Sequence, residues 1–502
     1  MTKNRKRLIV LGIDSLDSVL LNRFEPFLPN FKRLKEQMPT LKYSSVLPPD
    51  SITAWASIYT GCDPAKHGRV YFIAVDKVNE AIYNEIDNND FHGKTFWDIA
   101  SDAKKKVCVL FPHIGYPPWK VNGLMVSKAI TKEEIRSYPE SAIRGYDLSD
   151  VKRLRGVPTV FQRKRYIKDA QRLLLNEESF GLRIYEDYKP DLFFLYSSVL
   201  DFIEHNFWSL CDKDDPAYPG SNSYEEVIKK FYKLYDNMLG KFLKLLDSET
   251  TLMVLSDHGH GMRPVKLFNI NEFLRREGAL ASKIKSTHFY DPYFAIEQLK
   301  HCLTFLIDKF SKYGLGNLAI SVLHYFTAGR KLYKAPSYID WDKTLAHLAD
   351  LSGVKAYSYG GIVIRMDNLK QQNYEQIRTE IIEKLRNIKI PSSGKALFKL
   401  VCRREDLYKG KHISKFPDIL FELSDEYGAG WSVNSSLFGR TYSHKLHAGT
   451  HKRDTGVFLI SNPDKISKDL NEISCMDIAP TVLGLLDVKG DYSFDGRCIV
   501  ED

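Results

Sequence analysis

The chain has 502 residues, more than the roughly 100 to 200 of one typical domain, which indicates a large domain with an insertion or two domains. Hydrophobic residues make up 43% and charged residues 27%, so a disordered, collagenous or multi-spanning membrane chain is excluded. Lys and Arg outnumber Asp and Glu by 72 to 63, and the resulting net charge of +9 suits an anionic ligand.

Cysteine usage and hydropathy favour a cytoplasmic location. The seven cysteines are scattered without a Cys-x-x-Cys pair, which is typical of reduced thiols rather than a disulfide framework. The N-terminal apolar run stops at Asp14 and is too short for a signal peptide, and no run approaches the roughly 18 residues of a membrane span. The basic clusters lack interleaved aromatic residues, so we expect no specific nucleic-acid partner and no transmembrane segment; the sequence specifies no oligomeric state.

Short apolar runs alternate with amphipathic, helix-like stretches along the chain. The runs are LIVLGI at 8–13, VCVLF at 107–111, DLFFLY at 191–196 and TLMVLS at 251–256. This alternation predicts an α/β fold, with a doubly wound, mostly parallel sheet and helices on both faces. Ligands of such sheets bind at the carboxyl ends of the strands, so the polar residues after each run are the candidates for a site.

The pattern changes at residues 262–341, where helix-like segments rich in Lys, Phe, Tyr and Leu predict a largely helical insertion. This insertion is either a lid over the site or a peripheral decoration. Strand-like runs return after Asp342 (GGIVIRM, PDILFEL and GVFLIS), and we expect them to rejoin the sheet. The expected division is therefore a catalytic core of residues 1–261 and 342–502, with the insertion at 262–341.

Candidate metal ligands follow three of the runs. Asp14 ends the first, and Asp257 and His258 end the fourth, where an adjacent carboxylate and imidazole can share one ion. Asp201 and His205 lie beyond the third run with the i, i+4 spacing that puts both on one helix face. Each alone has a structural explanation, as a turn former, a helix cap or a helix-stabilising pair. Three such sites at one sheet edge favour metal binding.

Ser51 is a candidate nucleophile. Pro48 and Pro49 end the preceding element, Asp50 and Ser51 take helix-cap positions, and ITAWASIYTG reads as a short buried helix ending at Gly61. Ser51 is then either a simple cap or a hydroxyl placed where a helix N-terminus favours a phosphate and a developing alkoxide. Composition alone leaves both interpretations open.

Six blocks in chain order resemble the alkaline phosphatase superfamily, above all its type I phosphodiesterase/nucleotide pyrophosphatase branch and its predicted phosphohydrolase/phosphomutase members. They are LIVLGIDS, PPDSITAWASIYTGCDPAKHG, LYSSVLDFIEH, VLSDHGHGM, GTHKRDTGVFLISNP and MDIAPTVLGLLDV, between residues 8 and 488. The resemblance implies an alkaline phosphatase-like fold and a two-metal site. Matched residue by residue, it implies that Ser51 is the nucleophile and also a metal ligand, beside the ion held by Asp14, Asp257 and His258. It implies that Asp201, His205 and His451 hold the other ion. Without the resemblance, His451 is not distinguished from the nearby His444 and His447.

Two departures from related patterns bear on the substrate. Ser51 is not followed by the x-Pro-x-Arg of the sulfatase signature, which disfavours a formylglycine sulfatase. Phe72 stands where nucleotide pyrophosphatases place a phosphate-binding Asn, which puts a nucleotide substrate in doubt.

The charges of the implied site fit a phosphate ester. Three carboxylates contribute −3 and two divalent ions +4, and ionisation of Ser51 brings the cluster to about zero. Mixed imidazole and carboxylate ligands suit Zn²⁺ or Mn²⁺, and the resemblance favours zinc.

We therefore expect a metal-dependent phosphoric ester hydrolase of small-molecule substrates, a phosphodiesterase or pyrophosphatase that works through a phosphoserine. The alternatives are a phosphomutase or a phosphomonoesterase using the same serine, and a non-catalytic protein that binds anionic membranes. Five aromatic residues near the ligands in sequence are either core residues or a clamp for a planar leaving group, and core packing is the favoured interpretation; they are Trp55, Tyr71, Phe72, Phe207 and Trp208.

Overall fold

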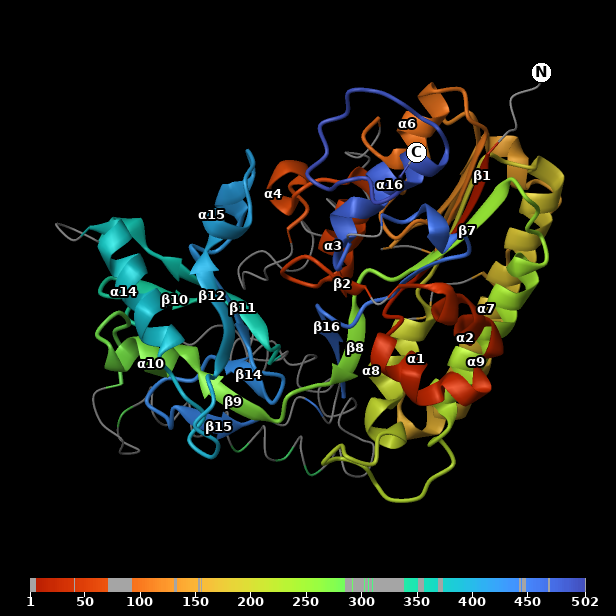
Figure 1. The fold of residues 1–502 in the computed structure, drawn as a ribbon. Coiled ribbons are helices and arrows are strands. Elements are labelled where there is room, and N and C mark those ends of the chain that lie inside the picture. The colour runs from red at the N-terminus through yellow and green to blue at the C-terminus, as the bar shows by residue number, and fades with distance from the viewer. Residues whose placement is uncertain are drawn as a thin grey trace.

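The structure is a computed structural model. It describes residues 6–501 except for 40, 71–92, 131–132, 152–153, 155, most of 285–337, 351–355, 369–372, 442–443, 445–447 and 468–469. Figure 1 shows two parts, a larger one that holds both ends of the chain and a smaller one formed by its green-to-blue middle section.

A seven-stranded sheet with the order β17-β7-β1-β6-β3-β4-β5 forms the centre of the larger part. Its strands are β1 (Arg7–Ile13), β3 (Val107–Leu110), β4 (Gly123–Lys128), β5 (Ile135–Tyr138), β6 (Leu192–Ser197), β7 (Thr250–Leu255) and β17 (Phe458–Ile460). The five inner strands are parallel, whereas β17 and β5 run antiparallel to their neighbours at the two edges. The predicted α/β fold with a mostly parallel sheet is confirmed.

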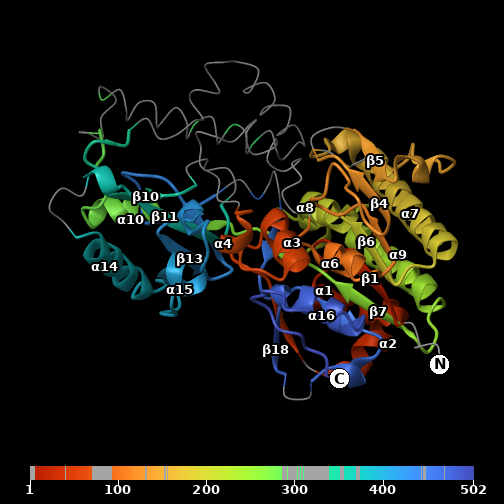
Figure 2. The ribbon, with the colours of Figure 1, turned by 90° about the horizontal axis from the view of Figure 1, so that it is seen from above.

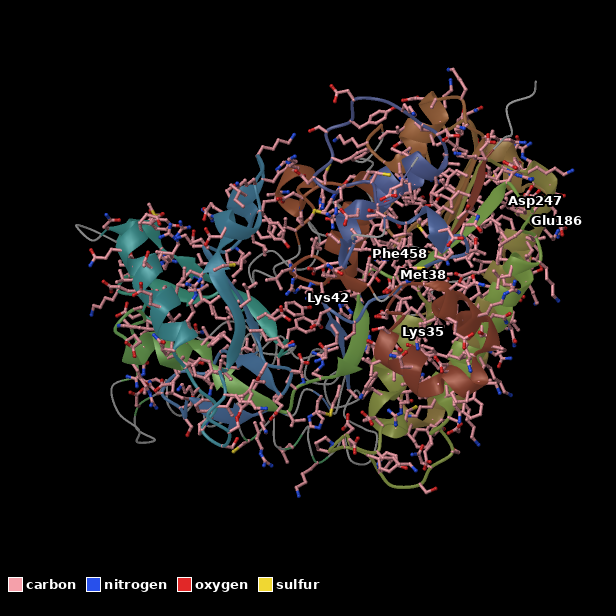
Figure 3. All side chains as sticks on the ribbon, viewed as in Figure 1. Lys35, Met38, Lys42, Glu186, Asp247 and Phe458 are labelled. Carbon is pink, nitrogen blue, oxygen red and sulfur yellow. The ribbon has the colours of Figure 1, made fainter. Side chains whose placement is uncertain are left out.

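Helices cover both faces of this sheet (Figure 2), because alternate residues of each buried strand point to opposite sides. Leu8 and Val10 of β1 pack against α3 (Ser51–Thr60), α6 (Phe96–Asp102) and α16 (Ile478–Leu485). Ile9 and Leu11 pack on the other side, and the helices there are α1 (Ser18–Phe24), α2 (Pro29–Gln37), α7 (Arg163–Tyr188), α8 (Val199–Cys211) and α9 (Val227–Leu243). Figure 3 shows side chains crowding the space between the sheet and these helices.

Gly12 of β1 sets how closely α3 approaches the sheet. A Cβ at Gly12 would lie 2.8 Å from Cη2 of Trp55 and 3.3 Å from Cζ of Phe194, and both rings are fully buried. We expect Gly12→Ala to lower the free energy of unfolding by about 1 to 3 kcal/mol through overpacking. Denaturant unfolding measures this, with Gly439→Ala as the control, because a Cβ there comes no closer than 3.6 Å to Asn269. Equal stability of the two variants would contradict the close packing.

The smaller part contains two of the three strand-like runs that we expected in the central sheet. The first two runs form β11 (Tyr359–Ile364) and β13 (Ile419–Leu423), which lie in a separate four-stranded antiparallel sheet with β10 (Ala346–Leu348) and β12 (Phe398–Arg403). This sheet packs with α10 (Ile270–Arg276) and α14 (Tyr374–Arg386) around a third core that includes Phe268. Apolar runs predict burial but do not specify which core buries them, so the expectation was wrong for these two and right for β17.

Short elements complete the described chain. A three-stranded sheet joins β14 (Tyr427–Gly430), β9 (Lys266–Asn269) and β15 (Phe438–Arg440), and two pairs join β16 (Gly449–Lys452) to β8 (Gly259–Met262) and β18 (Glu472–Ser474) to β2 (Lys42–Ser44). The helices α4 (Pro64–His67) and α15 (Arg404–Leu407) are single turns. Most of the predicted insertion lies outside the described residues, so its helical nature, its boundaries and its lid role stay predictions. None of the described helices has the length and hydropathy to cross a bilayer.

Candidate metal centre

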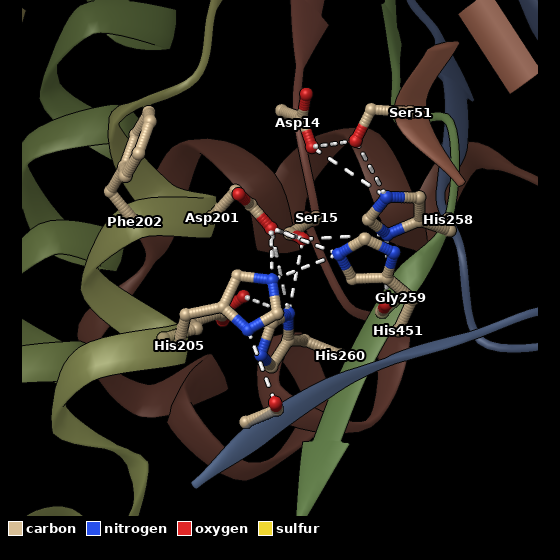
Figure 4. A network of polar contacts seen from close by, with 12 residues as sticks. Asp14, Ser15, Ser51, Asp201, Phe202, His205, His258, Gly259, His260 and His451 are labelled. Carbon is tan, nitrogen blue, oxygen red and sulfur yellow. Dashed lines mark hydrogen bonds and ion pairs between the residues drawn. The ribbon is translucent and has the colours of Figure 1, made fainter. Parts of the chain in front are cut away.

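The carboxyl edge of the central sheet gathers the predicted site residues (Figure 4). Asp14 directly follows β1, and Asp257 and His258 follow β7 after one intervening residue. These two strands are parallel neighbours, so both groups leave the sheet at the same edge. Asp201 and His205 lie in α8, which begins just after β6, while Ser51 begins α3 and His451 lies in β16.

Ser51 is the first residue of α3 but not its cap. The Asp50 side chain takes that role by accepting a hydrogen bond from the backbone N–H of Ile52. The hydroxyl of Ser51 is therefore left for other partners, and its Oγ lies 3.5 Å from Oδ1 of Asp14 and 3.2 Å from Nε2 of His258. Ser51 is partly exposed, whereas Asp14 and His258 are buried, so the hydroxyl lies on the accessible side of the cluster.

Two aromatic side chains hold the carboxylate of Asp14. The hydroxyl of Tyr196 donates a hydrogen bond to its Oδ2 at 2.5 Å, and the indole N–H of Trp55 donates to the same oxygen at 3.3 Å. These bonds leave Oδ1 directed at Ser51 and at His258, whose Nε2 is 3.7 Å away. Tyr196 is the penultimate residue of β6 and pairs with Gly12, and its place near the strand end is a signal that the sequence offered and that we did not use.

Backbone carbonyls fix the orientation of the three predicted histidine ligands. Nδ1 of each ring lies 2.9 to 3.1 Å from a carbonyl oxygen: His205 from Gly449, His258 from Gly259 and His451 from Pro49. A carbonyl only accepts hydrogen bonds, so Nδ1 carries the proton in each ring. In the neutral form of each ring, Nε2 then carries the lone pair and can bind a cation, the arrangement that is typical of metal-binding histidines.

The lone pairs of His205 and His451 converge on Asp201. The two Nε2 atoms are 2.9 Å apart, and they lie 3.2 Å and 3.5 Å from Oδ1 of Asp201. Two unprotonated nitrogens cannot form a hydrogen bond with each other. A cation placed among the three atoms removes the repulsion between them.

Three sets of donor atoms could hold a metal ion among the described residues, with all atoms of a set within 4.8 Å of one another. They are Asp14, Asp257 and His258; Asp201, His258 and His451; and Asp201, His205 and His260. Oδ2 of Asp257 is buried and accepts no hydrogen bond from the described residues, as expected of an atom that a cation completes. The donor atoms therefore fit divalent ions, and the three sets together include all six of the predicted Asp and His ligands.

The acidic groups are costly to ionise without cations. Burial raises the pKa of Asp14 well above its ordinary value, and the charges of Asp257 and Asp201 raise it further. Burial and then Asp201 likewise raise the pKa of Asp257. At Asp201 burial also opposes ionisation, but the imidazoles of His205 and His451 outweigh it and lower the pKa well below its ordinary value. Burial and then His258 lower the pKa of His451 to about 3, so this imidazole is neutral near pH 7.

These shifts predict how stability depends on pH. The folded-state pKa values of Asp14 and Asp257 lie above the ordinary 3.8, so their protonated forms stabilise the metal-free fold at low pH, and this contribution is lost as pH rises through the raised values. A bound divalent cation replaces the protons. We therefore expect the rise in Tm on adding Mn²⁺ to grow as pH rises above the ordinary carboxyl value of 3.8. Thermal unfolding with and without Mn²⁺ checks this, and an increment that shrinks with pH would contradict it.

Sequence analysis missed Ser15 and His260. Ser15 adopts a left-handed backbone conformation, with φ +66, and its hydroxyl donates a hydrogen bond to Oδ1 of Asp201 at 2.8 Å. His260 pairs with His451 across β8 and β16. Ser15 lies two residues after β1, as Asp257 does after β7, and this strand-end spacing is a signal that was not used, whereas His260 lies within β8 and had no such signal.

The structure describes some of the remaining candidates, which are the five aromatic residues and the two histidines near His451. Trp55 and Phe207 are fully buried and Trp208 is 6% exposed, so these three pack in the core rather than form an open clamp. His444 belongs to none of the donor sets found among the described residues. His447, Tyr71 and Phe72 lie outside the described residues.

Comparisons with known proteins identify the family. The chain matches the family model of type I phosphodiesterase/nucleotide pyrophosphatase over residues 8–451. No curated protein matches it significantly. Among solved structures, it is similar to phosphonoacetate hydrolase from Sinorhizobium meliloti 1021 in complex with phosphonoformate, with 14% identity over 97% of both chains and a TM-score of 0.52. The complex of that protein with phosphonoacetate gives 14% identity, coverage of 97% and 96%, and a TM-score of 0.52.

Murine ectonucleotide pyrophosphatase/phosphodiesterase 5, as an inactive variant in complex with AMP, gives 13% identity, coverage of 97% and 96%, and a TM-score of 0.48. The similarity to phosphonoacetate hydrolase supports the α/β fold described above. Because the family model spans most of the sequence, the chain belongs to the type I phosphodiesterase/nucleotide pyrophosphatase family of the alkaline phosphatase superfamily and is a phosphoester hydrolase.

Proposed function

We propose that the protein is a two-metal phosphodiesterase or pyrophosphatase that acts on a small-molecule substrate through a phosphoseryl intermediate on Ser51. The observation that carries this proposal is the position of the Ser51 hydroxyl, within 3.5 Å of Asp14 and His258 at the accessible side of a buried Asp/His cluster. The family match supports a phosphoric diester or anhydride bond as the target.

The described side chains would hold two ions. Asp14, Asp257 and His258 would bind one beside Ser51, and Asp201, His205 and His451 would bind the other. Zn²⁺ or Mn²⁺ suits this mixture of imidazoles and carboxylates. When bound, such ions would neutralise the charge of a phosphate and make an adjacent oxygen easier to deprotonate.

The chain itself positions and activates the nucleophile. Ser51 lies at the N-terminus of a ten-residue buried helix, where backbone N–H groups and the helix dipole favour negative charge on Oγ and on a phosphate. Oγ gives up its proton and attacks phosphorus, the bond to the leaving oxygen breaks on the opposite side, and that oxygen takes up a proton, so that a phosphoseryl ester remains. Water then attacks the same phosphorus, the Oγ–P bond breaks, and Oγ receives a proton that the water has lost.

Hydrolysis of paired aryl esters tests the proposal. The holoenzyme is assayed with bis(p-nitrophenyl) phosphate and p-nitrophenyl phosphate, before and after chelation and after return of Zn²⁺ or Mn²⁺. We expect the diester to react faster, activity to vanish with the metal and activity to return on its addition. Full activity in protein shown to be metal-free would contradict the two-metal proposal. Faster cleavage of the monoester would instead favour a phosphomonoesterase.

A phosphomutase using the same serine differs in the fate of the phosphoryl group. It would return this group to a hydroxyl of the substrate rather than to water. Release of inorganic phosphate from a monoester, with no transfer to added alcohols, would exclude the mutase.

We also infer a cytoplasmic location. No disulfide joins any of the cysteines in the described part of the chain, as expected of a reducing compartment. Retention of the protein in the cytosolic fraction of its host cell would test this inference.

A further inference from the structure

Asp201 is surrounded by further donor atoms that neither of the two proposed metal positions uses. They belong to Ser15, Glu204 and His260. Glu204 precedes His205 in α8, His260 lies in β8, and Ser15 follows Asp14 after β1. Glu204 and Ser15 are fully buried and His260 is 3% exposed. The cluster is assembled from three separate elements, so the fold builds it, not a local run of acidic residues.

The spacing of these donor atoms suits one cation. Nδ1 of His260 lies 3.1 Å from Oγ of Ser15, 3.6 Å from Oε2 of Glu204 and 3.9 Å from Oδ1 of Asp201. Oγ of Ser15 is 2.8 Å from the same Asp201 oxygen (Figure 4). Ligands about 2.1 Å from a common ion lie about 3 to 3.5 Å from one another, so only small shifts would bring the four atoms around one ion.

The carboxylate of Glu204 points one unsatisfied oxygen at this cluster. The hydroxyl of Tyr232 donates a hydrogen bond to Oε1 at 3.0 Å and thereby orients the group. Oε2 is buried and accepts no hydrogen bond from the described residues. The arrangement repeats that of Asp14, where a tyrosine hydroxyl holds one oxygen and leaves the other for the centre. A buried carboxylate oxygen without a donor is destabilising, and a bound cation would offset this cost.

We propose that Ser15, Asp201, Glu204 and His260 bind a third divalent cation that adjoins the two-metal centre. The inference rests on the proposed function, because Asp201 would serve both the third ion and the second. Two carboxylates, a hydroxyl and one imidazole form a mainly oxygen donor set, which suits Mn²⁺ or Mg²⁺. The third ion adds +2 and Glu204 adds −1, so the centre gains one positive charge, which favours an anionic substrate.

Metal counting tests the third site with Mn²⁺ as the probe. The full chain is stripped with a chelator, equilibrated with Mn²⁺, separated from free metal and analysed for manganese per chain. We expect three equivalents in the wild type and two in Glu204→Gln, which keeps the shape of the side chain and removes its charge. Glu272→Gln is the matched control, because Glu272 is a buried glutamate of the smaller part, paired with Arg275 and Arg276, and this variant should retain three.

Anomalous diffraction from Mn²⁺-loaded crystals locates the ions and keeps the test sharp should Glu204→Gln fail to fold. We expect a third peak between Nδ1 of His260 and Oε2 of Glu204, and its loss in His260→Gln. Two peaks at the proposed positions with none beside Glu204 would overturn the third site and leave the two-metal proposal standing. If the two proposed positions were instead empty at saturating Mn²⁺, the proposed function would be overturned. His260 ligating the second ion, with a total of two, would also overturn the third site.

Discussion

Replacing Ser51 with alanine is expected to lower phosphodiester turnover by about 10⁴-fold or more, because it removes the oxygen that forms the covalent intermediate. The six Asp and His side chains that would hold the two ions remain in this variant, so its metal content should stay close to that of the wild type. Steady-state kinetics with bis(p-nitrophenyl) phosphate and elemental analysis of the same samples measure both quantities. Near-normal turnover by the alanine variant would remove Ser51 from the mechanism.

Ser57→Ala is the matched control for this experiment. Ser57 lies in the same helix and is fully buried, but its hydroxyl contacts Nε2 of His67 at 2.9 Å and takes no part in the metal cluster. The substitution should leave turnover within a few-fold of the wild type. Ser51→Thr adds a second comparison, because it keeps a hydroxyl at the helix N-terminus and should retain far more activity than Ser51→Ala.

The sequence was sufficient to predict those site residues that follow recognisable strand ends. Asp14 and Asp257 each follow a mainly apolar run, and a parallel sheet brings such positions to one edge. Asp201 and His205 were recognised from their helical spacing. His451 could be placed only through the family resemblance, because its position depends on β16 pairing with β8, and nothing in the local sequence sets that pairing.

The parts that sequence analysis did not predict depend on tertiary packing. The apolar runs of β11 and β13 resemble those of central strands, but they pair with each other and pack around a separate core. Tyr196 reads as one more aromatic residue of a buried strand until the fold directs its hydroxyl at Asp14. The role of Ser15 could be predicted only from its backbone conformation. With φ +66 its Oγ lies beside Asp201, whereas an extended residue would direct the side chain elsewhere. Side-chain direction, rather than residue type, was the missing information.

Asp201→Asn is expected to have the second large effect, a loss of at least one bound ion per chain and a fall in kcat/KM of about 10³-fold. Asp201 contributes to two of the three donor sets, and its Oδ1 lies within 3.5 Å of Nε2 of both His205 and His451. The amide keeps the volume but removes the negative charge that offsets the cations, and two neutral imidazoles alone hold a divalent ion weakly.

The control for this change is Asp212→Asn. Asp212 is the C-cap of the same helix, α8. The Asp212 carboxylate accepts a hydrogen bond from Nε1 of Trp208 and lies near Arg23, outside all of the donor sets, so this variant should keep its metal and its activity. Elemental analysis and kinetics on both variants separate a local loss of charge from a general weakening of α8. Removing a charged ligand that two donor sets share must weaken metal binding if the Asp/His cluster holds the catalytic ions. If Asp201→Asn retained every ion and a normal rate, the Asp/His cluster would therefore not be the catalytic metal centre.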